Sequence, residues 1–407
     1  METPQGYKQT EVGLIPDDWE VTQLQELIDP DRKITYGIVV PGRNIPDGVP
    51  MIRAQDYSRG WVDINELYRV STEIDKSYKR SKVVTGDILL TIVGSVGNLA
   101  KVPSAFNGSN ITQQTARLAF NKKIADPDFY QNILRSSLGQ KEIFNYTKSG
   151  VQPSLNLSDV DKFCVPYPPL PEQKTIAQAL SEADAAIAEI DRLITKKRNI
   201  KQGITQQLLT GKRRLAGFSG EWEVKKLGDV VDFSNGKAHE NSISQTGKFI
   251  VINSKFISTQ AEVKKYSNCC FCPVYTGQIV MVMSDVPNGR AIAKCFYIDK
   301  GDKYTLNQRI CSLKAITVDS LFLFYLIDRN PYYLAFDDGV KQTNLRKEDV
   351  LSCPLKLPPT IEEQKAIAQV LSDMDTEIEA LEQKRNKYKA IKQGMMQELL
   401  TGRTRLI

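Results

Sequence analysis

The sequence predicts two mixed α/β domains, each followed by a long helix, with the two helices packed antiparallel as a coiled coil. Residues 171–215 and 362–406 align without a gap, and roughly half of their positions are identical. A fainter repeat precedes each helix, since the Trp-Glu-Val stretch that begins at Trp19 recurs at Trp222. Two tandem copies of a globular unit plus a helix predict an internal pseudo-two-fold repeat.

The predicted domain boundaries follow the proline-rich stretches that precede the helices. They give a globular domain at 1–165, a central helical repeat at 166–215, a second globular domain at 216–356 and a C-terminal helical repeat at 357–407. Proline disfavours helix in the residue before it, so the chain is expected to arrive extended at Pro168-Pro169 and Pro358-Pro359 and then turn into a helix. Gly211 and Gly402, which follow Leu-Leu-Thr, are expected helix stops.

Apolar residues in both helical repeats recur in alternating steps of four and three, which predicts a narrow apolar stripe on each helix. The predicted seam residues are Ile176, Leu180, Ile187, Ile190 and Ile194 in the first repeat and Ile367, Leu371, Met374, Ile378 and Leu381 in the second. About 40 helical residues would span roughly 60 Å. Each stripe has its twin as a natural mate, so we expect a coiled-coil core here rather than a partner site.

A few short motifs occur in the same order in both globular domains, while the sequences between these motifs differ almost completely. Thr85-Gly86 before an apolar strand matches Thr276-Gly277, Gln114 matches Gln308, Gly150-Val151 matches Gly339-Val340, and Asn156-Leu157 matches Asn344-Leu345. The pattern indicates one scaffold with two different surfaces.

The net charge of +6 over 407 residues is only mildly basic. Bulk charge of this size does not coat phosphates, so DNA binding would need placed side chains and help from a partner. The seven cysteines fit reduced thiols better than a disulfide framework. No secretory leader or membrane-length apolar run is visible, so a cytoplasmic location is expected.

The motifs that end the two globular units resemble those of a known protein family. Each variable α/β unit is closed by a Gly…Asn-Leu…Pro-Pro…Glu-Gln-Lys…Ile-Ala…Leu stretch and by a helix that ends in Leu-Leu-Thr-Gly. This doubled block resembles the specificity (S) subunit of type I restriction–modification systems, over essentially the whole chain. The resemblance implies two target recognition domains, each reading one half of a split, asymmetric double-stranded DNA site. It also implies that the coiled coil fixes the spacer between the halves.

The same resemblance implies a non-catalytic chain that holds no cofactor of its own. Such a chain recruits two copies of a modification subunit, which transfers methyl groups from S-adenosylmethionine to adenine N6. It also recruits restriction subunits, which translocate and cut DNA with ATP and Mg²⁺.

Signals for catalysis or metal binding in this chain are weak. Asn330-Pro331-Tyr332-Tyr333 lacks the second proline of an adenine methyltransferase loop. Gly94-Ser95-Val96-Gly97 is a lone Gly-x-x-Gly, which favours a turn over a cofactor loop. Glu172-Gln173-Lys174 opens a helix instead of lying on the strands of a nuclease. Cys269 to Cys272 holds one Cys-x2-Cys without a second close pair for zinc, and His239 is the only histidine.

Arg, Lys, Asn and Gln read base edges, so we take these residues in polar, glycine-punctuated segments as candidates for DNA contact, with a few neighbouring Ser and Tyr. In the first domain the candidates are Tyr36, Arg43, Asn44, Arg53, Gln55, Asn98, Asn110, Gln113, Gln114, Gln152 and Asn156. In the second they are Lys237, Asn253, Ser254, Lys255, Asn288, Arg290, Asn307, Gln308, Arg309, Lys341, Gln342 and Asn344. Because Gln114 and Gln308 recur in both domains, they are either base readers or scaffold residues. The basic stretch Lys196-Lys197-Arg198 is either a solvated face or a modification-subunit contact.

The main alternative function is a coiled-coil scaffold whose globular units bind protein and not DNA. A copy that stands alone without partner subunits is a third possibility. A neighbouring reading frame that carries Asn-Pro-Pro-Phe would favour the DNA-specificity interpretation.

Overall fold

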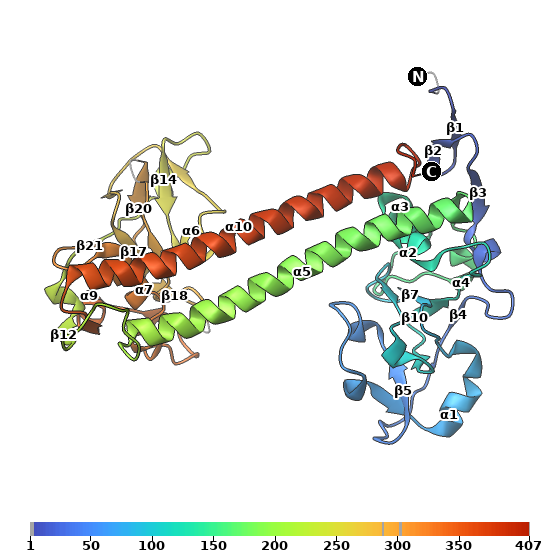
Figure 1. The fold of residues 1–407 in the computed structure, drawn as a ribbon, viewed down its shortest axis with the longest axis horizontal. Helices are drawn as coiled ribbons and strands as arrows, with labels where there is room; N and C mark the ends of the chain where they lie inside the picture. Colours follow the sequence, from blue (N-terminus) through green and yellow to red (C-terminus); the bar gives the residue numbers. More distant parts are fainter. Residues whose placement is uncertain (1–3, 287–288, 301–302, 407) are drawn as a thin grey trace. The chain divides into compact units, whose positions relative to one another are not determined.

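The computed structural model describes residues 4–286, 289–300 and 303–406. The chain divides into two compact units. Unit 1 holds the chain up to Asp191 together with the part from Lys384 onward, and unit 2 holds Arg192–Gln383. The long helices α5 (Leu170–Leu209) and α10 (Ile361–Leu399) each contribute a segment to both units (Figure 1). None of the helices in the described ranges is long and apolar enough to cross a membrane.

Unit 1 contains small sheets and short helices that precede α5. Its strands are β1 (Tyr7–Thr10), β2 (Gly13–Pro16), β3 (Glu20–Gln23), β4 (Thr35–Tyr36), β5 (Val49–Ile52), β6 (Tyr68–Val70), β7 (Ile88–Thr91), β8 (Leu99–Lys101), β9 (Asn110–Ile111), β10 (Thr115–Leu118) and β11 (Cys164–Tyr167). Its shorter helices are α1 (Thr72–Ser77), α2 (Pro127–Arg135), α3 (Ser137–Tyr146) and α4 (Leu157–Val160), with 3-10 turns at Leu24–Leu27, Ala54–Asp56, Ile64–Glu66, Lys79–Ser81 and Ser104–Phe106.

Unit 2 repeats this plan. Its strands are β12 (Glu223–Lys226), β13 (Val231–Asn235), β14 (Phe249–Ile252), β15 (Tyr266–Ser267), β16 (Pro273–Val274), β17 (Ile279–Val282), β18 (Ser284–Asp285), β19 (Cys295–Tyr297), β20 (Tyr304–Leu306), β21 (Ile310–Ala315), β22 (Thr343–Asn344) and β23 (Pro354–Leu357). Its shorter helices are α6 (Ser254–Ser258), α7 (Ser320–Ile327), α8 (Pro331–Leu334) and α9 (Lys347–Leu351), with 3-10 turns at Leu227–Asp229 and Glu240–Ser242.

The two larger sheets of each unit correspond, and so do the pairs β3-β11 and β12-β23, whereas β1-β2 and β18-β22 are not counterparts of each other. The four-stranded sheet β4-β10-β7-β8 of unit 1 matches β13-β21-β17-β19 of unit 2. A second sheet in each unit contains one parallel pair, β5 with β9 and β14 with β20. The buried strands β7 and β17 are apolar throughout, apart from Thr91, because both of their faces are covered. The predicted fold class, two mixed α/β domains with packed long helices, is confirmed.

Within each unit, the α5 and α10 segments run antiparallel. In unit 1, Lys392 pairs with Asp184 and Arg385 with Asp191. In unit 2, Lys201 pairs with Asp375. Along these pairs the residue numbers rise on α5 while they fall on α10, so the two helices are antiparallel. These side chains are partly exposed, so each pair contributes little to stability and serves mainly to set the register.

The predicted seam residues are buried or half-buried along both helices. Ile190, Ile194 and Ile378 are almost fully buried. Near the helix starts the stripe widens into the domain core: Ile176 and Leu180 share a cluster with Trp19 and with Leu399 of α10. Ile367 and Leu371 join the unit 2 core in the same way. The helix ends are therefore part of the globular cores and not only of a two-helix seam.

The repeated Glu-Gln pair at each helix start has a structural role. Gln173 accepts from the Asp126 N–H at 2.9 Å and donates to the Pro168 carbonyl at 2.9 Å. Gln364 makes the equivalent contacts with Asp319, at 2.8 Å, and with Pro358, at 3.2 Å. Each glutamine thus ties its long helix to the start of α2 or α7, where it satisfies buried backbone groups.

In each unit, an arginine that follows the C-terminal end of one long helix forms an ion pair with a glutamate in the first turn of the other. In unit 1 the Arg405 guanidinium binds Glu172 through Nε at 2.5 Å and Nη2 at 2.8 Å, and lies over the Trp19 ring. In unit 2 Arg214 binds Glu363 through Nη2 at 2.6 Å and lies over Trp222. We call these two arrangements the arginine clasps. Both glutamates are almost completely buried, so each carboxylate depends on its arginine.

Backbone pairing corrects two of the matches made from the sequence. The carbonyl that accepts the Ile92 N–H belongs to Gln114, whereas its counterpart in unit 2, which accepts the Met283 N–H, belongs to Arg309. The structural counterpart of Gln308 is therefore Gln113, one residue earlier.

The second correction concerns the Asn-Leu pairs. Leu155 donates its N–H to Ile92, and Leu345 donates to Met283, so these two leucines are equivalent. Asn156 is then the residue before α4, whereas Asn344 lies in β22. Counted from the equivalent leucines, the two Asn-Leu pairs are two residues out of register, because Asn156 lies one residue after Leu155 whereas Asn344 lies one residue before Leu345.

Candidate nucleic-acid interface

Polar side chains of unit 1 converge on an open pocket of about 540 Å³. It is lined by Ile38, Val39, Pro41, Met51, Arg53, Ala54, Gln55, Ser58, Tyr68, Val93, Gly94, Ser95, Asn98, Thr112, Gln113 and Gln114. The chain brings these residues together because β5 and β9 are parallel, so the segments that follow both strands leave the sheet at the same edge. The loop after β7 closes one end. We call this site the unit 1 pocket.

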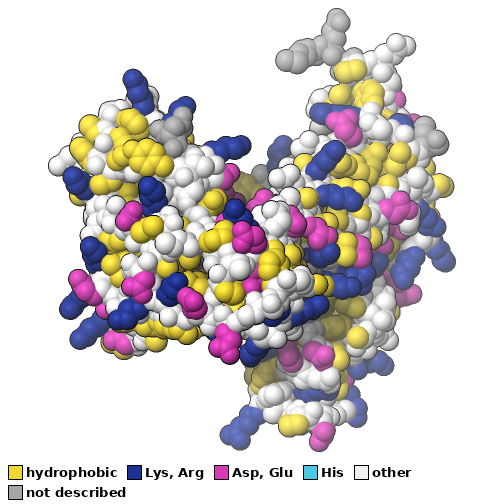
Figure 2. Space-filling model, turned by 60° about the vertical axis from the view of Figure 1, so that its left-hand side comes forward, with side chains coloured by type: hydrophobic (Ala, Val, Ile, Leu, Met, Phe, Trp, Pro, Cys, Tyr) yellow, Lys and Arg dark blue, Asp and Glu magenta, His cyan; other side chains and the backbone are white. Residues whose placement is uncertain are grey.

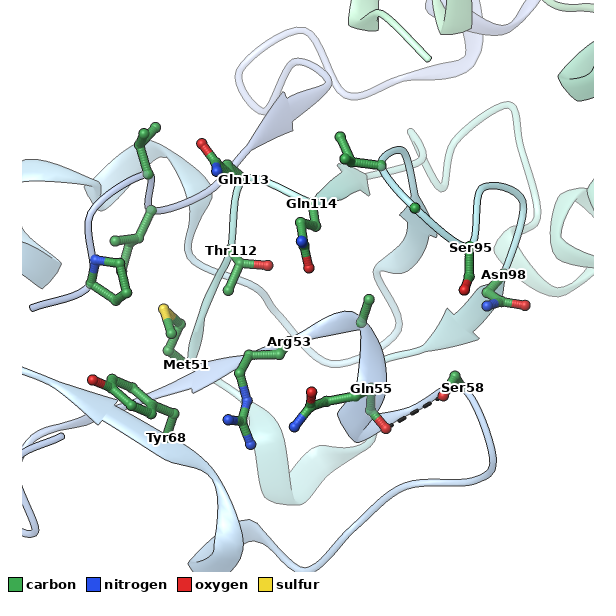
Figure 3. Close-up of a pocket in the computed structure, with 16 residues that line it drawn as sticks. Met51, Arg53, Gln55, Ser58, Tyr68, Ser95, Asn98, Thr112, Gln113 and Gln114 are labelled. Carbon is green, nitrogen blue, oxygen red and sulfur yellow. Dashed lines mark hydrogen bonds between the residues drawn. The ribbon is translucent and has the colours of Figure 1, made fainter. Parts of the chain in front are cut away.

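The side chains lie on facing walls of the unit 1 pocket (Figure 3). Gln114 points into the space from one wall, and Arg53 and Gln55 rise from the other. Ser95 and Asn98 stand at one end, with Met51 and Tyr68 at the opposite end. Arginine and glutamine are the side chains that make two-point contacts with guanine and adenine in the major groove. The pocket thus presents base-reading chemistry on a rigid frame.

Arg53 is held in a fixed orientation by Asp56. Its Nε donates to Asp56 Oδ2 at 3.1 Å and its Nη2 donates to Asp56 Oδ1 at 2.9 Å. Asp56 is buried, and its Oδ2 also accepts the Arg53 backbone N–H at 2.8 Å. The guanidinium lies over the Tyr68 ring at 5.7 Å. Since Asp56 uses Nε and one side of Nη2, the remaining donors are available to a ligand without a large loss of side-chain entropy.

One glycine in each unit allows the chain to pass close to the backbone that ends or follows the second parallel strand. A Cβ on Gly37 would lie 1.8 Å from the Ile111 carbonyl oxygen, and one on Gly236 would lie 2.0 Å from the Asn307 carbonyl oxygen. These two glycines are structural counterparts, because the next residues, Ile38 and Lys237, donate to Ile111 and Leu306. Beneath the pocket the Tyr57 hydroxyl contacts Thr91 Oγ1 at 2.8 Å and Thr115 Oγ1 at 3.1 Å. Burial raises the pKa of Tyr57, so it stays a neutral bridge.

The structure distributes the other unit 1 candidates unevenly. Arg53, Gln55, Asn98, Gln113 and Gln114 line the pocket, and Gln152 lies beside Gly94 at its edge. Tyr36, Arg43, Asn44 and Asn156 are exposed but do not line it.

Asn110 is fully buried. Its amide accepts from Ser81 Oγ at 2.6 Å and donates to Asp75 at 3.2 Å. Because these contacts fix α1 against the sheet and satisfy the amide, we leave Asn110 out of the proposed interface.

Unit 2 presents equivalent positions with different side chains. Asn253 follows β14 where Arg53 follows β5, and Asn307, Gln308 and Arg309 follow β20 where Thr112, Gln113 and Gln114 follow β9. Asn253 caps α6 by accepting the Phe256 N–H at 2.9 Å. Gln308 donates to Glu240 at 2.6 Å, a bond that lowers the pKa of that carboxyl.

The remaining unit 2 candidates lie in several places. Lys237, Ser254 and Lys255 lie with Asn253 on the side of the parallel pair. Gln342 and Asn344 both bond Ser284 Oγ, at 2.8 and 2.7 Å. Arg290 and Lys341 are exposed. Asn288 lies outside the described residues.

The motifs that suggested catalysis have structural roles. Gly94 and Gly97 have φ of 82° and 93°, as expected of a turn. Glu172 is occupied by Arg405 and Trp19, while Lys174 is exposed. His239 is buried between the Lys237 carbonyl and Thr305 Oγ1, at 2.7 and 2.8 Å. The described residues contain no group of three His, Cys, Asp or Glu side chains that could hold a metal ion.

Sequence reasoning missed Ser58, Tyr68, Ser95 and Thr112 as pocket residues. Thr112 immediately precedes two chosen glutamines, so its position next to a strand end was a usable signal. Tyr68 comes from β6, and nothing in its local sequence distinguishes it from a core tyrosine. On the face seen in Figure 2, Lys and Arg are interspersed with Asp and Glu and form no broad basic patch. Contact with DNA would therefore use individual side chains.

Comparison with known proteins agrees with this architecture. The family model for the type I restriction modification DNA specificity domain matches residues 16–202 and 219–390. The EcoBI specificity subunit of Escherichia coli is 34% identical over 229 residues, which cover 55% of this chain and 47% of that protein. The putative MjaX specificity subunit of Methanocaldococcus jannaschii is 28% identical and is covered over 97% of its length, with 99% of this chain.

Solved structures show the same fold. The crystal structure of an S subunit from M. genitalium superposes with a TM-score of 0.61 at 14% identity, covering 98% of both chains. The two family-model matches together span well over half of the sequence. The chain therefore belongs to the family of type I restriction–modification DNA specificity subunits, which are themselves non-catalytic.

Proposed function

We propose that the two globular parts of this chain read the two halves of a bipartite, asymmetric double-stranded DNA site. In this proposal the domains are residues 1–165 and 216–356, and the helical repeats 166–215 and 357–407 set the spacer between the half-sites. The observation that supports the proposal is that equivalent strand ends in the two units carry different side chains. Arg53 and Gln114 stand in unit 1 where Asn253 and Arg309 stand in unit 2.

In unit 1, base readout would begin at Arg53. Its orientation is set by Asp56 before DNA arrives, so a two-point contact with guanine O6 and N7 is geometrically specific. Gln114, on the facing wall, offers an amide of the type that pairs with adenine N6 and N7. Exposed lysines around the loops would hold phosphates and carry no sequence information.

In unit 2 the same backbone positions would read a different half-site. Arg309 replaces Gln114, and Lys255 follows Asn253 where Gln55 follows Arg53. Gln113 and Gln308, which are equivalent and both exposed, would make a contact common to the two halves. The other basic or amide candidates outside these positions, among them Arg43 and Lys341, remain predictions.

The partners proposed are two copies of a modification subunit and the restriction subunits. A chain with two similar helical repeats offers an equivalent face twice, which suits two copies of one partner. S-adenosylmethionine, ATP and Mg²⁺ would act in those partners and not in this chain. The proposed place of action is the cytoplasm, where reduced thiols such as the seven of this sequence persist.

The test is methylome sequencing of a host that expresses this chain with its cognate modification subunit. We expect one split motif with N6-methyladenine in each half. A contiguous motif, or DNA-independent assembly without any methylated motif, would contradict the proposal and favour a protein-binding scaffold.

A further inference from the structure

Two valines stand out as exposed apolar side chains at glycine-containing loop tips. Val151 is fully exposed and Val340 is 75% exposed. Each follows a glycine, Gly150 or Gly339, and the pair Gly-Val is retained in both units although the loops around it differ. Counted back from the equivalent leucines Leu155 and Leu345, the valine lies four residues earlier in unit 1 and five residues earlier in unit 2, so the corresponding loop of each unit carries one exposed valine.

The loop that carries Val151, residues 148–154, lies at the edge of the unit 1 pocket, and we call it the unit 1 tip. Lys148 and Ser154 exchange backbone hydrogen bonds of 2.8 and 3.2 Å, which close the loop around Val151. The Gly94 N–H donates to the Pro153 carbonyl at 2.9 Å. Since Gly94 lines the pocket, this bond fixes the tip beside the base-reading side chains.

The unit 2 tip is held by two aspartates. Asp338 Oδ1 accepts the N–H groups of Val340 and Lys341, at 2.9 and 3.0 Å. These bonds lower the pKa of Asp338, so its carboxylate holds the loop across the physiological range. Asp337 Oδ1 accepts the Gly339 N–H and the Thr343 hydroxyl, both at 3.0 Å. Both tips are therefore ordered before any ligand binds.

We propose that Val151 and Val340 are apolar wedges that enter the DNA duplex, one at each half-site, and support the extrusion of the target adenine. This inference rests on the proposed function. Half-sites of different sequence share one event, the removal of an adenine from the base stack, so a contact repeated in both units fits a sequence-independent role. A branched apolar side chain that replaces lost stacking stabilises the opened duplex by burial and reads no base edge.

The experiment uses the full chain assembled with its modification subunits and a duplex that carries 2-aminopurine in place of one target adenine. The fluorescence of 2-aminopurine rises when the base leaves the stack. Val151→Ser is expected to lower the extruded fraction about tenfold in one half-site only, and Val340→Ser in the other, because each change removes the burial of one valine side chain. Val151→Leu, which keeps an apolar tip, is expected to retain extrusion.

Two other exposed valines serve as matched controls. Val84 lies in the turn before β7, at the end opposite Gly94, and Val224 lies in β12. Val84→Ser and Val224→Ser are expected to leave extrusion unchanged in both half-sites.

Three outcomes would overturn the inference. The first is wild-type extrusion in both Val151→Ser and Val340→Ser, with DNA binding intact. The second is loss of assembly with the modification subunits, which would make the tips protein contacts. The third is an equal loss in both half-sites from either single change. Failure of the wild-type complex to bind a split site is a separate result, because it would overturn the proposed function itself.

Discussion

Units 1 and 2 share their framework and differ at the strand ends that we propose to read DNA. What recurs is structural: the close-approach glycines Gly37 and Gly236, the Glu-Gln pairs and the arginine clasps. What changes after the parallel strands is Arg53 to Asn253 and Gln114 to Arg309, and a third counterpart pair, Ile38 and Lys237, follows β4 and β13. The comparison indicates that a new DNA sequence can be read without altering the frame that holds the reader.

The two arginine clasps also differ in completeness. In unit 1 the Trp19 Nε1–H donates to Glu172 Oε2 at 3.0 Å, and Arg405 also binds Asp18 through two contacts of 2.9 Å. In unit 2 the Trp222 Nε1–H is buried without a partner in the described part of the chain. A buried donor without a partner costs free energy, so unit 1 is expected to have the stronger clasp.

The largest expected effect is on the clasps. Arg405→Met should lower the free energy of unfolding of unit 1 by about 3 kcal/mol, because it leaves the buried Glu172 carboxylate without its charge partner. Arg214→Met should destabilise unit 2 by a similar or smaller amount. Amide hydrogen exchange of the full chain, resolved by peptide, measures each unit separately. Arg385→Met, whose partner Asp191 is about half exposed, is the control and should cost less than about 1 kcal/mol.

If Arg405→Met and Arg385→Met lowered the free energy of unfolding of unit 1 equally, the stabilising role of the clasps would be wrong. Protection lost equally in both units from Arg405→Met alone would do the same, since the clasp contacts lie within unit 1.

The next effect concerns the close-approach glycines. Gly37→Ala and Gly236→Ala should each destabilise the region around the parallel strand pair of their unit by about 1–3 kcal/mol, because the added methyl group collides with backbone. Gly108→Ala is a weaker perturbation, since nothing lies within 4 Å of its Cβ position, although its φ of 84° carries some strain. Hydrogen exchange in β9 and β20 checks the ranking. Equal protection in all three variants would contradict the close-approach argument.

The fold was largely predictable from the sequence, and the site only in part. The helices and their register follow from a constant offset, so Glu172 and Glu363 matched correctly. Gln114 and Gln308 did not, because unit 1 has two adjacent glutamines and residue identity alone does not show that Gln113 is the counterpart of Gln308. Asn110 shows a second limit: local polarity marks it as a reader, but the fold buries it against Ser81 and Asp75. Pairing across a sheet is non-local, and local sequence does not encode it.

A medium effect is expected for single pocket residues. Arg53→Ala should weaken DNA binding by the assembled complex about 10- to 100-fold, as expected for the loss of one two-point base contact. Arg59→Ala, an exposed arginine that does not line the pocket, should have a much smaller effect that is uniform across sequences. Fluorescence anisotropy with the cognate site measures both. Similar losses from the two changes would show that Arg53 contributes charge and not readout.

The smallest expected effect is a difference between the two units in how their stability depends on pH. Burial raises the pKa of Asp328 in unit 2, whereas unit 1 has Arg135 at the corresponding end of α2. A raised pKa in the folded state means that the stability from the protonated carboxyl is present at low pH and is lost as pH rises through that pKa. Asp328→Asn keeps the acceptor for the Cys295 N–H. It should therefore raise the stability of unit 2 at neutral pH and flatten its pH dependence, which hydrogen exchange at several pH values measures. Unchanged pH dependence would contradict this assignment.

Methylome sequencing of reciprocal variants shows whether each unit reads its own half-site. We expect that Arg53→Asn, which places the unit 2 residue in unit 1, alters the methylated motif in one half only. Asn253→Arg should alter the other half only, and the spacing between the halves should stay constant in both. If either variant changes both halves, or if neither changes any base of the motif, the two units do not read DNA separately through these strand ends.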